Sequence, residues 1–233
     1  AETEELADPV PALEGLDLSD AEALRGSIDL DSAENRALAN RLAEEAVVLL
    51  RNDGVLPLGR PERIAVIVPN ADDPYAVLGC YSFPAHIGIQ HSDIPIGIDL
   101  PTVLDSLRAE FPDATIDHVL GTSIDGGETD GIASAVDAAR AADVTILALG
   151  DRSGLFGRGT SGEGCDAESL RLPGAQQELV DAVLAAGVPT VVTLLAGRPY
   201  ALGSAVPDAA AIVQTFFPGE GGTQALAGVL SGR

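Results

Sequence analysis

Residues 143–149 are Asp143-Val-Thr-Ile-Leu-Ala-Leu149, a short and mostly apolar run. Such a run is typical of a strand that is buried on both faces of a parallel sheet. The runs Ile64-Ala-Val-Ile-Val68 and Thr190-Val-Val-Thr-Leu-Leu195 have the same character, one earlier in the chain and one later. We therefore predict that the three segments are strands of one sheet whose two faces are both covered.

Helical and strand patterns alternate along much of the remaining chain. Strand-like runs occur at residues 115–120 and 211–217. Helical spacing or composition predicts helices at residues 102–111, 132–142, 173–186 and 219–230. This alternation implies an α/β fold, a three-layer sandwich in which a mostly parallel sheet has helices on both faces and right-handed connections.

Another helix is predicted before the first strand. Asp31 can cap it, and Glu34 follows three residues later, a pattern typical of helix N-termini. Asn52-Asp53-Gly54 is expected to end it. Between these signals apolar residues repeat at helical spacing, at Leu38, Leu42, Ala46 and Leu50.

The composition excludes several classes of protein. The 233 residues are 46% hydrophobic, enough to bury a core, so global disorder is excluded. The net charge of −23 opposes binding to nucleic acids and anionic membrane surfaces, and no run approaches the ~18 apolar residues of a membrane-spanning helix. All 13 basic residues are arginine, which excludes Schiff-base lysine chemistry and a P-loop lysine.

Residues 1–30 differ from the rest of the chain. They are acidic, contain proline and have no periodicity, so we expect a linker or arm there and the folded domain at residues 31–233. The first residues lack the basic and apolar regions of a secretion signal. The sequence therefore leaves the cellular location open.

Two connections are too long for ordinary loops. One spans residues 69–101 and the other residues 150–172. Loops beyond about 12–15 residues in compact domains are usually functional or disordered. Because each connection follows a predicted strand, both should emerge at the carboxyl edge of the sheet, where open α/β folds hold their ligands.

The second connection is rich in glycine and carries an acidic residue. Gly157, Gly159 and Gly162 match G-x-G-x-x-G, but they lie too far from both strand and helix for a dinucleotide fingerprint. Glu163 stands between Gly162 and Gly164, so the backbone can approach a ligand closely and present the carboxylate. A lone glutamate in a glycine-rich loop is usually a solvated charge, so these residues alone assign Glu163 no role.

Five ordered motifs resemble the second domain of glycoside hydrolase family 3 enzymes. The resemblance as a whole covers roughly residues 31–233. The motifs are Ala46-Val-Val-Leu-Leu-Arg-Asn-Asp-Gly-Val-Leu-Pro-Leu58, Arg63-Ile-Ala-Val-Ile-Val-Pro-Asn-Ala-Asp72, Asp143–Gly150 followed by Ser161-Gly-Glu-Gly164 and Leu170-Arg-Leu-Pro-Gly-Ala-Gln176, Gly197-Arg-Pro199, and Phe217-Pro-Gly-Glu-Gly-Gly222.

The resemblance implies a part of a retaining exo-β-glycosidase of the β-glucosidase or β-xylosidase type. In such enzymes a barrel domain supplies an aspartate nucleophile, and the second domain supplies the acid/base glutamate, here Glu163. Retention needs the two carboxyl groups about 5–5.5 Å apart. No barrel fits in 233 residues beside this domain, so we expect an N-terminal barrel elsewhere in the parent chain, a chain end truncated after Arg233, and no activity from this chain alone.

Several residues could support Glu163. Arg158 or Ser161 could orient its carboxyl group, or could simply be solvated. In the first connection, aromatic and imidazole groups could form a subsite for the leaving group of a β-linked glycoside, or could pack the loop. These groups are Tyr81, Phe83, His86 and His91.

One cysteine lies in each long connection. Cys80 and Cys165 could form a disulfide that braces the loop of Glu163, or could be two buried thiols. Neither C-x-x-C nor a histidine pair with ligand spacing occurs, so we expect no metal, and we expect no cofactor.

Two other interpretations stay open. One is a stand-alone, flavodoxin-like binding domain, for which Asn70-Ala-Asp-Asp73 is the sole candidate for a phosphate turn. The other is a module that only packs against a barrel, with Glu163 incidental. The identity of the sugar is not indicated by the sequence.

Overall fold

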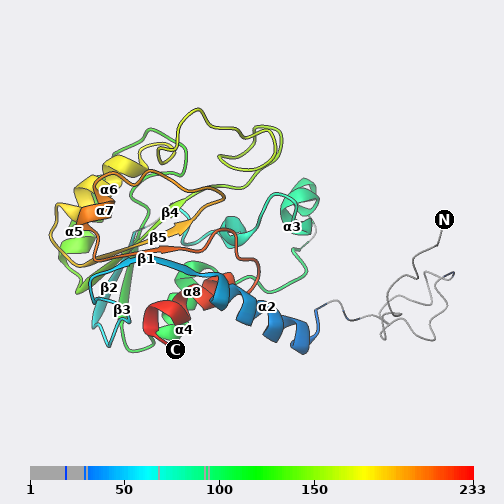
Figure 1. Ribbon diagram of the computed structural model, residues 1–233, viewed down its shortest axis with the longest axis horizontal. Helices are drawn as coiled ribbons and strands as arrows, with labels where there is room; N and C mark the ends of the chain where they lie inside the picture. The colour runs from blue at the N-terminus through cyan, green and yellow to red at the C-terminus, as the bar shows by residue number, and fades with distance from the viewer. Residues whose placement is uncertain (1–18, 20–28, 30, 68, 92, 94) are drawn as a thin grey trace, which may run out of the picture.

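A single six-stranded sheet runs through the computed structural model, which describes residues 19, 29, 31–67, 69–91, 93 and 95–233 (Figure 1). The strand order is β1-β6-β5-β4-β2-β3. Neighbouring strands from β3 to β6 are parallel, and β1 pairs antiparallel with β6 at one edge. The strands are β1 Val48–Asn52, β2 Arg63–Ile67, β3 Thr115–Val119, β4 Val144–Gly150, β5 Thr190–Leu195 and β6 Ala211–Gln214. The mostly parallel sheet predicted from the sequence is confirmed.

Helices cover both faces of the sheet, as expected for three layers. One face is covered by α4 (Val103–Glu110) and α8 (Gly222–Ser231), with α2 (Ala33–Ala46) packed on α8. The other face is covered by α5 (Ile132–Arg140), α6 (Gln176–Leu184) and the short α7 (Ala205–Asp208). Among the described residues no helix has both the length and the apolar character needed to cross a membrane.

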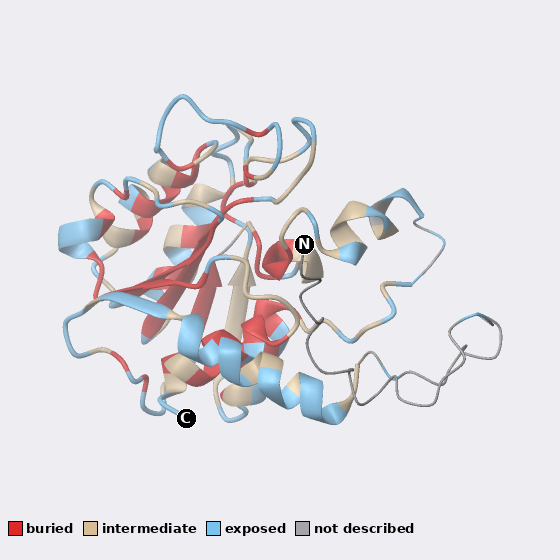
Figure 2. Cartoon of the chain, turned by 45° about the vertical axis from the view of Figure 1, so that its right-hand side comes forward, coloured by how far each residue is buried: buried red, intermediate tan, exposed pale blue. Residues whose placement is uncertain are grey.

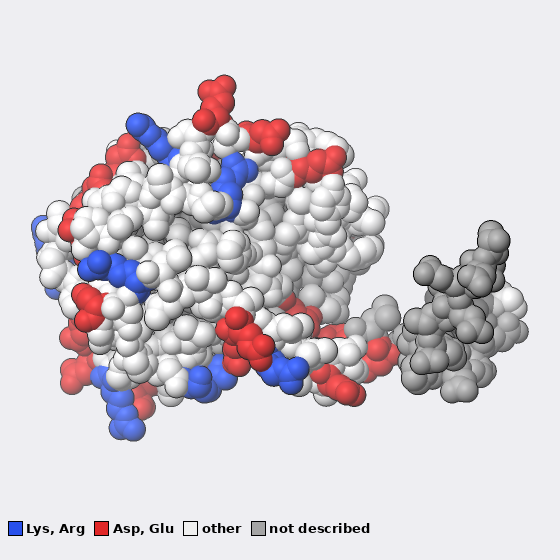
Figure 3. All heavy atoms as spheres, in the orientation of Figure 1, with Lys and Arg blue, Asp and Glu red and all other residues white. Residues whose placement is uncertain are grey.

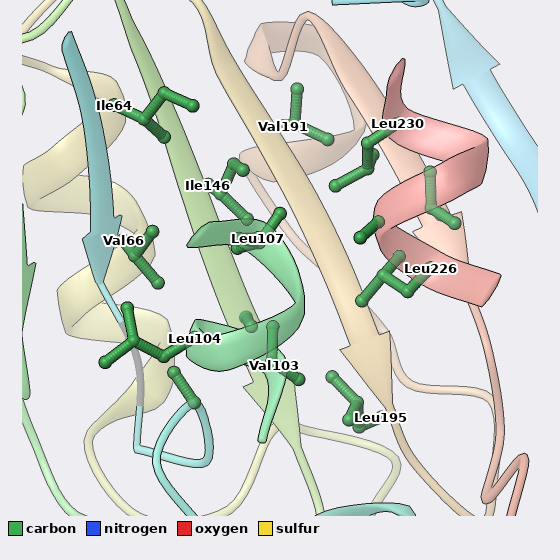
Figure 4. Packing of buried hydrophobic residues seen from close by; sticks show 14 of the residues in the cluster. Ile64, Val66, Val103, Leu104, Leu107, Ile146, Val191, Leu195, Leu226 and Leu230 are labelled. Atoms are coloured by element: carbon green, nitrogen blue, oxygen red, sulfur yellow. The ribbon is translucent and has the colours of Figure 1, made fainter. Parts of the chain in front are cut away.

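The centre of the sheet is buried because the four inner strands β2, β4, β5 and β6 contribute apolar side chains to two cores, one on each face. Every residue of β4, β5 and β6 is buried, and Figure 2 shows these strands in red at the centre of the molecule. Figure 4 shows the first core, in which Leu104 and Leu107 of α4 and Leu226 of α8 pack on the sheet. The sheet residues labelled in that view are Ile64, Val66, Ile146, Val191 and Leu195.

The prediction of the first helix is partly wrong. The helix ends at Ala46, and residues 48–52 form β1 instead of a last helical turn. The side chain that caps it is Ser32, whose Oγ accepts from the Asn35 amide, while Asp31 pairs with Arg36. Leu50 was the last residue of the apolar spacing that suggested a longer helix, but it is exposed on the edge strand β1. The structure of this segment is defined by its pairing with β6 and not by a helical face.

Three other element ends differ from the prediction by three residues, and one of them is the start of α8, at Gly222 and not at residue 219. Helix α6 begins at Gln176 and not at Pro173, because Gly174 takes a left-handed φ of 55° in the turn before it. Strand β6 ends at Gln214, three residues earlier than expected. The expected arm at residues 1–30 lies outside the described residues, apart from Ser19 and Asp29.

The Gln176 side chain joins α6 to the end of β4. It is fully buried, its Oε1 accepts from the Gly150 amide at 2.9 Å, and its Nε2 donates to the carbonyl oxygens of Gly150 (2.9 Å) and Ile124 (2.7 Å). These bonds satisfy backbone groups at the point where the strand ends and the second long loop begins. They fix the start of that loop.

We predict that Gln176→Leu lowers the free energy of unfolding by about 3 kcal/mol, because three hydrogen bonds to buried backbone groups are lost. Chemical denaturation of the two proteins measures the difference. The matched control is Gln177→Leu, since Gln177 is half-buried and bonds only to side chains near the surface. An equal loss in both variants would contradict the role of the Gln176 amide.

Candidate active site

The two long loops meet beyond the carboxyl ends of the adjacent strands β2 and β4. The Asn70 side chain, which follows β2, donates from Nδ2 to the Asp151 carbonyl oxygen, which follows β4, at 3.0 Å. The Ser153 hydroxyl donates to the Leu78 carbonyl oxygen. In Figure 1 the second loop (yellow-green) and α3 (Phe83–His86) of the first loop project beyond the sheet. The sequence-based expectation that both loops emerge at this edge is confirmed.

The second loop folds back on itself, so that residues 154–156 lie beside residues 161–163. The Gly154 amide donates to the Ser161 carbonyl oxygen at 2.9 Å, and the Phe156 amide donates to the Glu163 carbonyl oxygen at 2.8 Å. The pairing needs glycine at position 162, where φ is 125° and an added Cβ would lie 2.0 Å from the Gly154 carbonyl oxygen. The glycines therefore permit close backbone approach within the loop.

Glu163 is exposed at the end of this folded loop. Its Oε2 accepts a hydrogen bond from the Tyr81 hydroxyl, which comes from the first loop. The Tyr81 ring in turn meets the His86 ring edge-on, with centroids 5.6 Å apart and planes at 84°. Three of the residues singled out in the sequence are thus brought together across the two loops.

The remaining expected residues lie elsewhere around the loops. Ser161 is buried against Gly197, so its hydroxyl faces inward and is not beside the Glu163 carboxylate. Arg158 and His86 line a cavity between the two loops. Phe83 and His91 are exposed, and neither makes a hydrogen bond or ring contact with the second loop among the described residues.

The disulfide alternative is not realised in the structure, in which Cys80 and Cys165 are both free thiols. Cys80 is half-buried beside Gly162, where an added Cβ would lie 3.2 Å from its sulfur. Cys165 is buried, with its sulfur 3.7 Å from the carbonyl oxygens of Gly154 and Glu163. Both thiols lie beside the second loop, but only Cys165 is buried, so the alternative of two buried thiols is met in part. Among the described residues no cluster of three or more His, Cys, Asp or Glu side chains could hold a metal ion.

Sequence analysis missed the buried carboxylate beneath the loop. Asp151 is fully buried and accepts hydrogen bonds from the Gly197 amide (2.9 Å), the Thr160 hydroxyl (2.7 Å) and the Tyr200 hydroxyl. These donors come from the second loop itself and from the loop that follows β5. Burial raises the pKa of Tyr200 well above its ordinary value, and the hydrogen bond to Asp151 raises it further. An aspartate after a strand gives no sequence signal that separates it from a solvated charge.

Comparison with known proteins gives a consistent match. A family model described as the glycosyl hydrolase family 3 C-terminal domain matches residues 47–233. A beta-xylosidase of Formosa agariphila is 30% identical over 88% of this chain, and a periplasmic beta-glucosidase of Salmonella typhimurium is 33% identical over 87%. A solved beta-glucosidase from Listeria innocua has 29% identity over 92% of this chain, with a TM-score of 0.74. The chain spans only 28%, 27% and 27% of these three proteins respectively.

We predict that Tyr200→Phe makes stability less sensitive to alkaline pH. In the wild type the unfolded state loses the Tyr200 proton near pH 10.0, before the folded state does, so the free energy of unfolding falls as pH rises above that value. Without the phenol this fall is shallower, by up to about 1.4 kcal/mol per pH unit. Chemical denaturation of both proteins, at pH 7 and at a series of alkaline pH values, measures the free energy of unfolding and its dependence on pH.

The control for this comparison is Tyr75→Phe, at a half-buried tyrosine in the first loop. A change in slope that is seen in Tyr200→Phe and not in this variant belongs to the hydrogen-bonded pair of Tyr200 and Asp151. An unchanged alkaline slope in Tyr200→Phe would show that the hydroxyl titrates equally in the folded and unfolded states.

Proposed function

This chain belongs to glycosyl hydrolase family 3 and contains the C-terminal domain of that family, and we propose that this domain serves a retaining exo-β-glycosidase. The substrate class is a β-linked xyloside or glucoside, since the relatives are named as beta-xylosidases and beta-glucosidases. Both sugars present the same chemistry at the reacting bond. The choice between them is left to groups outside this domain.

Within this function we propose that Glu163 is the general acid/base. Its carboxylate is exposed at the carboxyl edge of the sheet and is held by Tyr81 from the neighbouring loop, and this contact is the observation that carries the proposal. The acid donates a proton to the glycosidic oxygen while a nucleophilic carboxylate attacks the anomeric carbon. The resulting carboxylate then removes a proton from the water that hydrolyses the glycosyl-enzyme intermediate.

We propose that the nucleophile belongs to a barrel domain of the parent chain. The chain spans about a quarter of the length of its relatives, which leaves room for such a domain in them. Retention requires that carboxylate about 5–5.5 Å from Glu163. The 233-residue chain alone is therefore expected to release no nitrophenol from aryl β-xylosides or β-glucosides above the rate in buffer.

We predict that Glu163→Ala, in the parent enzyme with its barrel domain, lowers kcat/KM for glycosides with poor leaving groups by about 10²–10⁴-fold. Substrates with dinitrophenolate leaving groups need no proton, so their glycosylation step should change little. Azide should partly restore turnover and give the β-glycosyl azide. Steady-state kinetics and product analysis measure both effects.

The matched control is Glu168→Ala, an exposed glutamate in the same loop. It should retain wild-type kinetics on both substrate types. Unchanged kinetics in Glu163→Ala would favour a domain that only packs against the barrel. Binding of a flavin or nucleotide to the chain would favour the flavodoxin-like alternative.

We further predict that Tyr81→Phe lowers kcat/KM by about tenfold for poor leaving groups, because the carboxyl loses the hydrogen bond that orients it. Activity on dinitrophenyl glycosides should stay near the wild-type value. A general structural role for Tyr81 would instead reduce both activities equally. The comparison of the two substrates therefore distinguishes positioning of the acid from loss of fold.

A further inference from the structure

The chain segment that follows β5 lies against the second long loop. An added Cβ at Gly197 would lie 2.2 Å from the Ser161 hydroxyl oxygen, so the two segments are in direct contact. The Gly197 amide and the Tyr200 hydroxyl both donate to the buried Asp151 carboxylate. The segment is therefore fixed on both sides of Arg198.

The Arg198 side chain extends from this segment to the second loop. Its Nη2 donates to the Cys165 carbonyl oxygen at 2.8 Å. Pro199 follows, and a residue before proline is restricted to extended backbone, which limits the directions in which the arginine can reach. A charged donor makes a stronger hydrogen bond than a neutral one. The contact therefore ties the second loop to a segment that is itself fixed.

Arg198 makes this bond to a neutral carbonyl group in a protein that is rich in carboxylates. The chain has 36 acidic side chains against 13 basic ones, and acidic side chains are plentiful on the face shown in Figure 3. Arg36 and Arg63 each pair with an aspartate, whereas Arg198 forms no ion pair within the described part of the chain. Its partner indicates that this side chain serves the loop and not the balance of surface charge.

The bonded carbonyl group lies two residues beyond Glu163. The Cys165 amide donates to the Gly162 carbonyl oxygen at 3.1 Å, so residues 162–165 form a turn that carries the glutamate. Gly162 and Gly164 both have positive φ, 125° and 69°, and glycine loses more conformational freedom on ordering than any other residue. A turn with two such residues needs contacts from outside to keep one conformation.

Beyond this turn the second loop has few contacts with other segments in the region that the structure describes. Residues 166–171 are all exposed. The next backbone bond from the loop to another segment is that of the Leu170 carbonyl oxygen, which accepts from the Ala201 amide at 2.7 Å. Arg198 is therefore the anchor on the carboxyl-terminal side of the turn that carries Glu163.

We propose that Arg198 is a positioning residue for the general acid/base and acts through the Cys165 carbonyl group. The proposal rests on the proposed function of Glu163. Arg198 holds the backbone of the turn, while Tyr81 holds the carboxyl group itself. A small displacement of a reacting group lowers the rate strongly. Loss of the Arg198 side chain should leave the domain folded but let the turn open locally.

The first experiment measures this opening in the 233-residue chain and does not depend on catalysis. The Cys165 thiol is buried against carbonyl oxygens of the folded loop, so iodoacetamide reaches it only when the turn opens. Arg198→Ala should raise the rate of Cys165 alkylation about tenfold, measured by mass spectrometry of the peptide. Below the unfolding transition this rate should not depend on urea, because local opening exposes little surface.

The matched control is Arg171→Ala, an exposed arginine near the end of the same loop whose side chain makes no hydrogen bond or ion pair among the described residues. Its Cys165 should react as in the wild type. Arg198→Lys keeps a charged donor and should retain most of the protection. The proposal is overturned if Arg198→Ala reacts at the wild-type rate. It is also overturned if the faster rate rises steeply with urea, since that dependence reports global unfolding.

The second experiment uses the parent enzyme with its barrel domain. Arg198→Ala should lower kcat/KM about tenfold for aryl glycosides with poor leaving groups, and should leave dinitrophenyl glycosides near the wild-type value. Equal losses on both substrates, or no loss on either, would overturn the positioning role. If Glu163→Ala leaves the kinetics unchanged, the acid/base role fails, while the protection of Cys165 still shows whether Arg198 holds the turn.

Discussion

The candidate active site depends on one buried carboxylate. A carboxyl group removed from water is unfavourable unless hydrogen bonds replace its hydration. Asp151 meets that requirement with three donors, and they come from two different loops. The chain can bury this group only if the loop after β4 folds back and the loop after β5 lies against it. The requirement thus selects one arrangement of the segments that carry Glu163.

The sheet supplies the frame for this arrangement. Parallel strands end at a common edge, so β2 and β4 deliver two long loops to the same place although they are far apart in the sequence. The amide of Gln176 fixes the end of β4, and the side chain of Asn70 bridges from the end of β2. Contacts between loops, such as that of Tyr81 with Glu163, can then be made by exposed side chains without a core of their own.

The elements of the fold were largely predictable because buried parallel strands have a distinctive sequence. Runs such as residues 190–195 are apolar and rich in β-branched side chains, and their strand has the predicted bounds. Strand β1 was missed because its exposed leucines continue a helical spacing by coincidence, and only pairing with β6 defines it. Glu163 was proposed from its glycine neighbours and the family resemblance. Asn70, Asp151 and Phe156 could not be recognised, since their burial, partners or backbone strain arise only when distant segments meet.

The conformation of Gly162 limits how this loop can be altered. No side chain can be added there without meeting the Gly154 carbonyl oxygen and displacing the loop partner of Glu163. A library that randomises this loop can vary its outward positions, but the clones that keep the fold of the loop will carry glycine at position 162. The mutational tolerance of this loop is therefore uneven, with permissive outward positions beside Gly154, Gly159 and Gly162, where an added Cβ would meet the backbone of the loop itself.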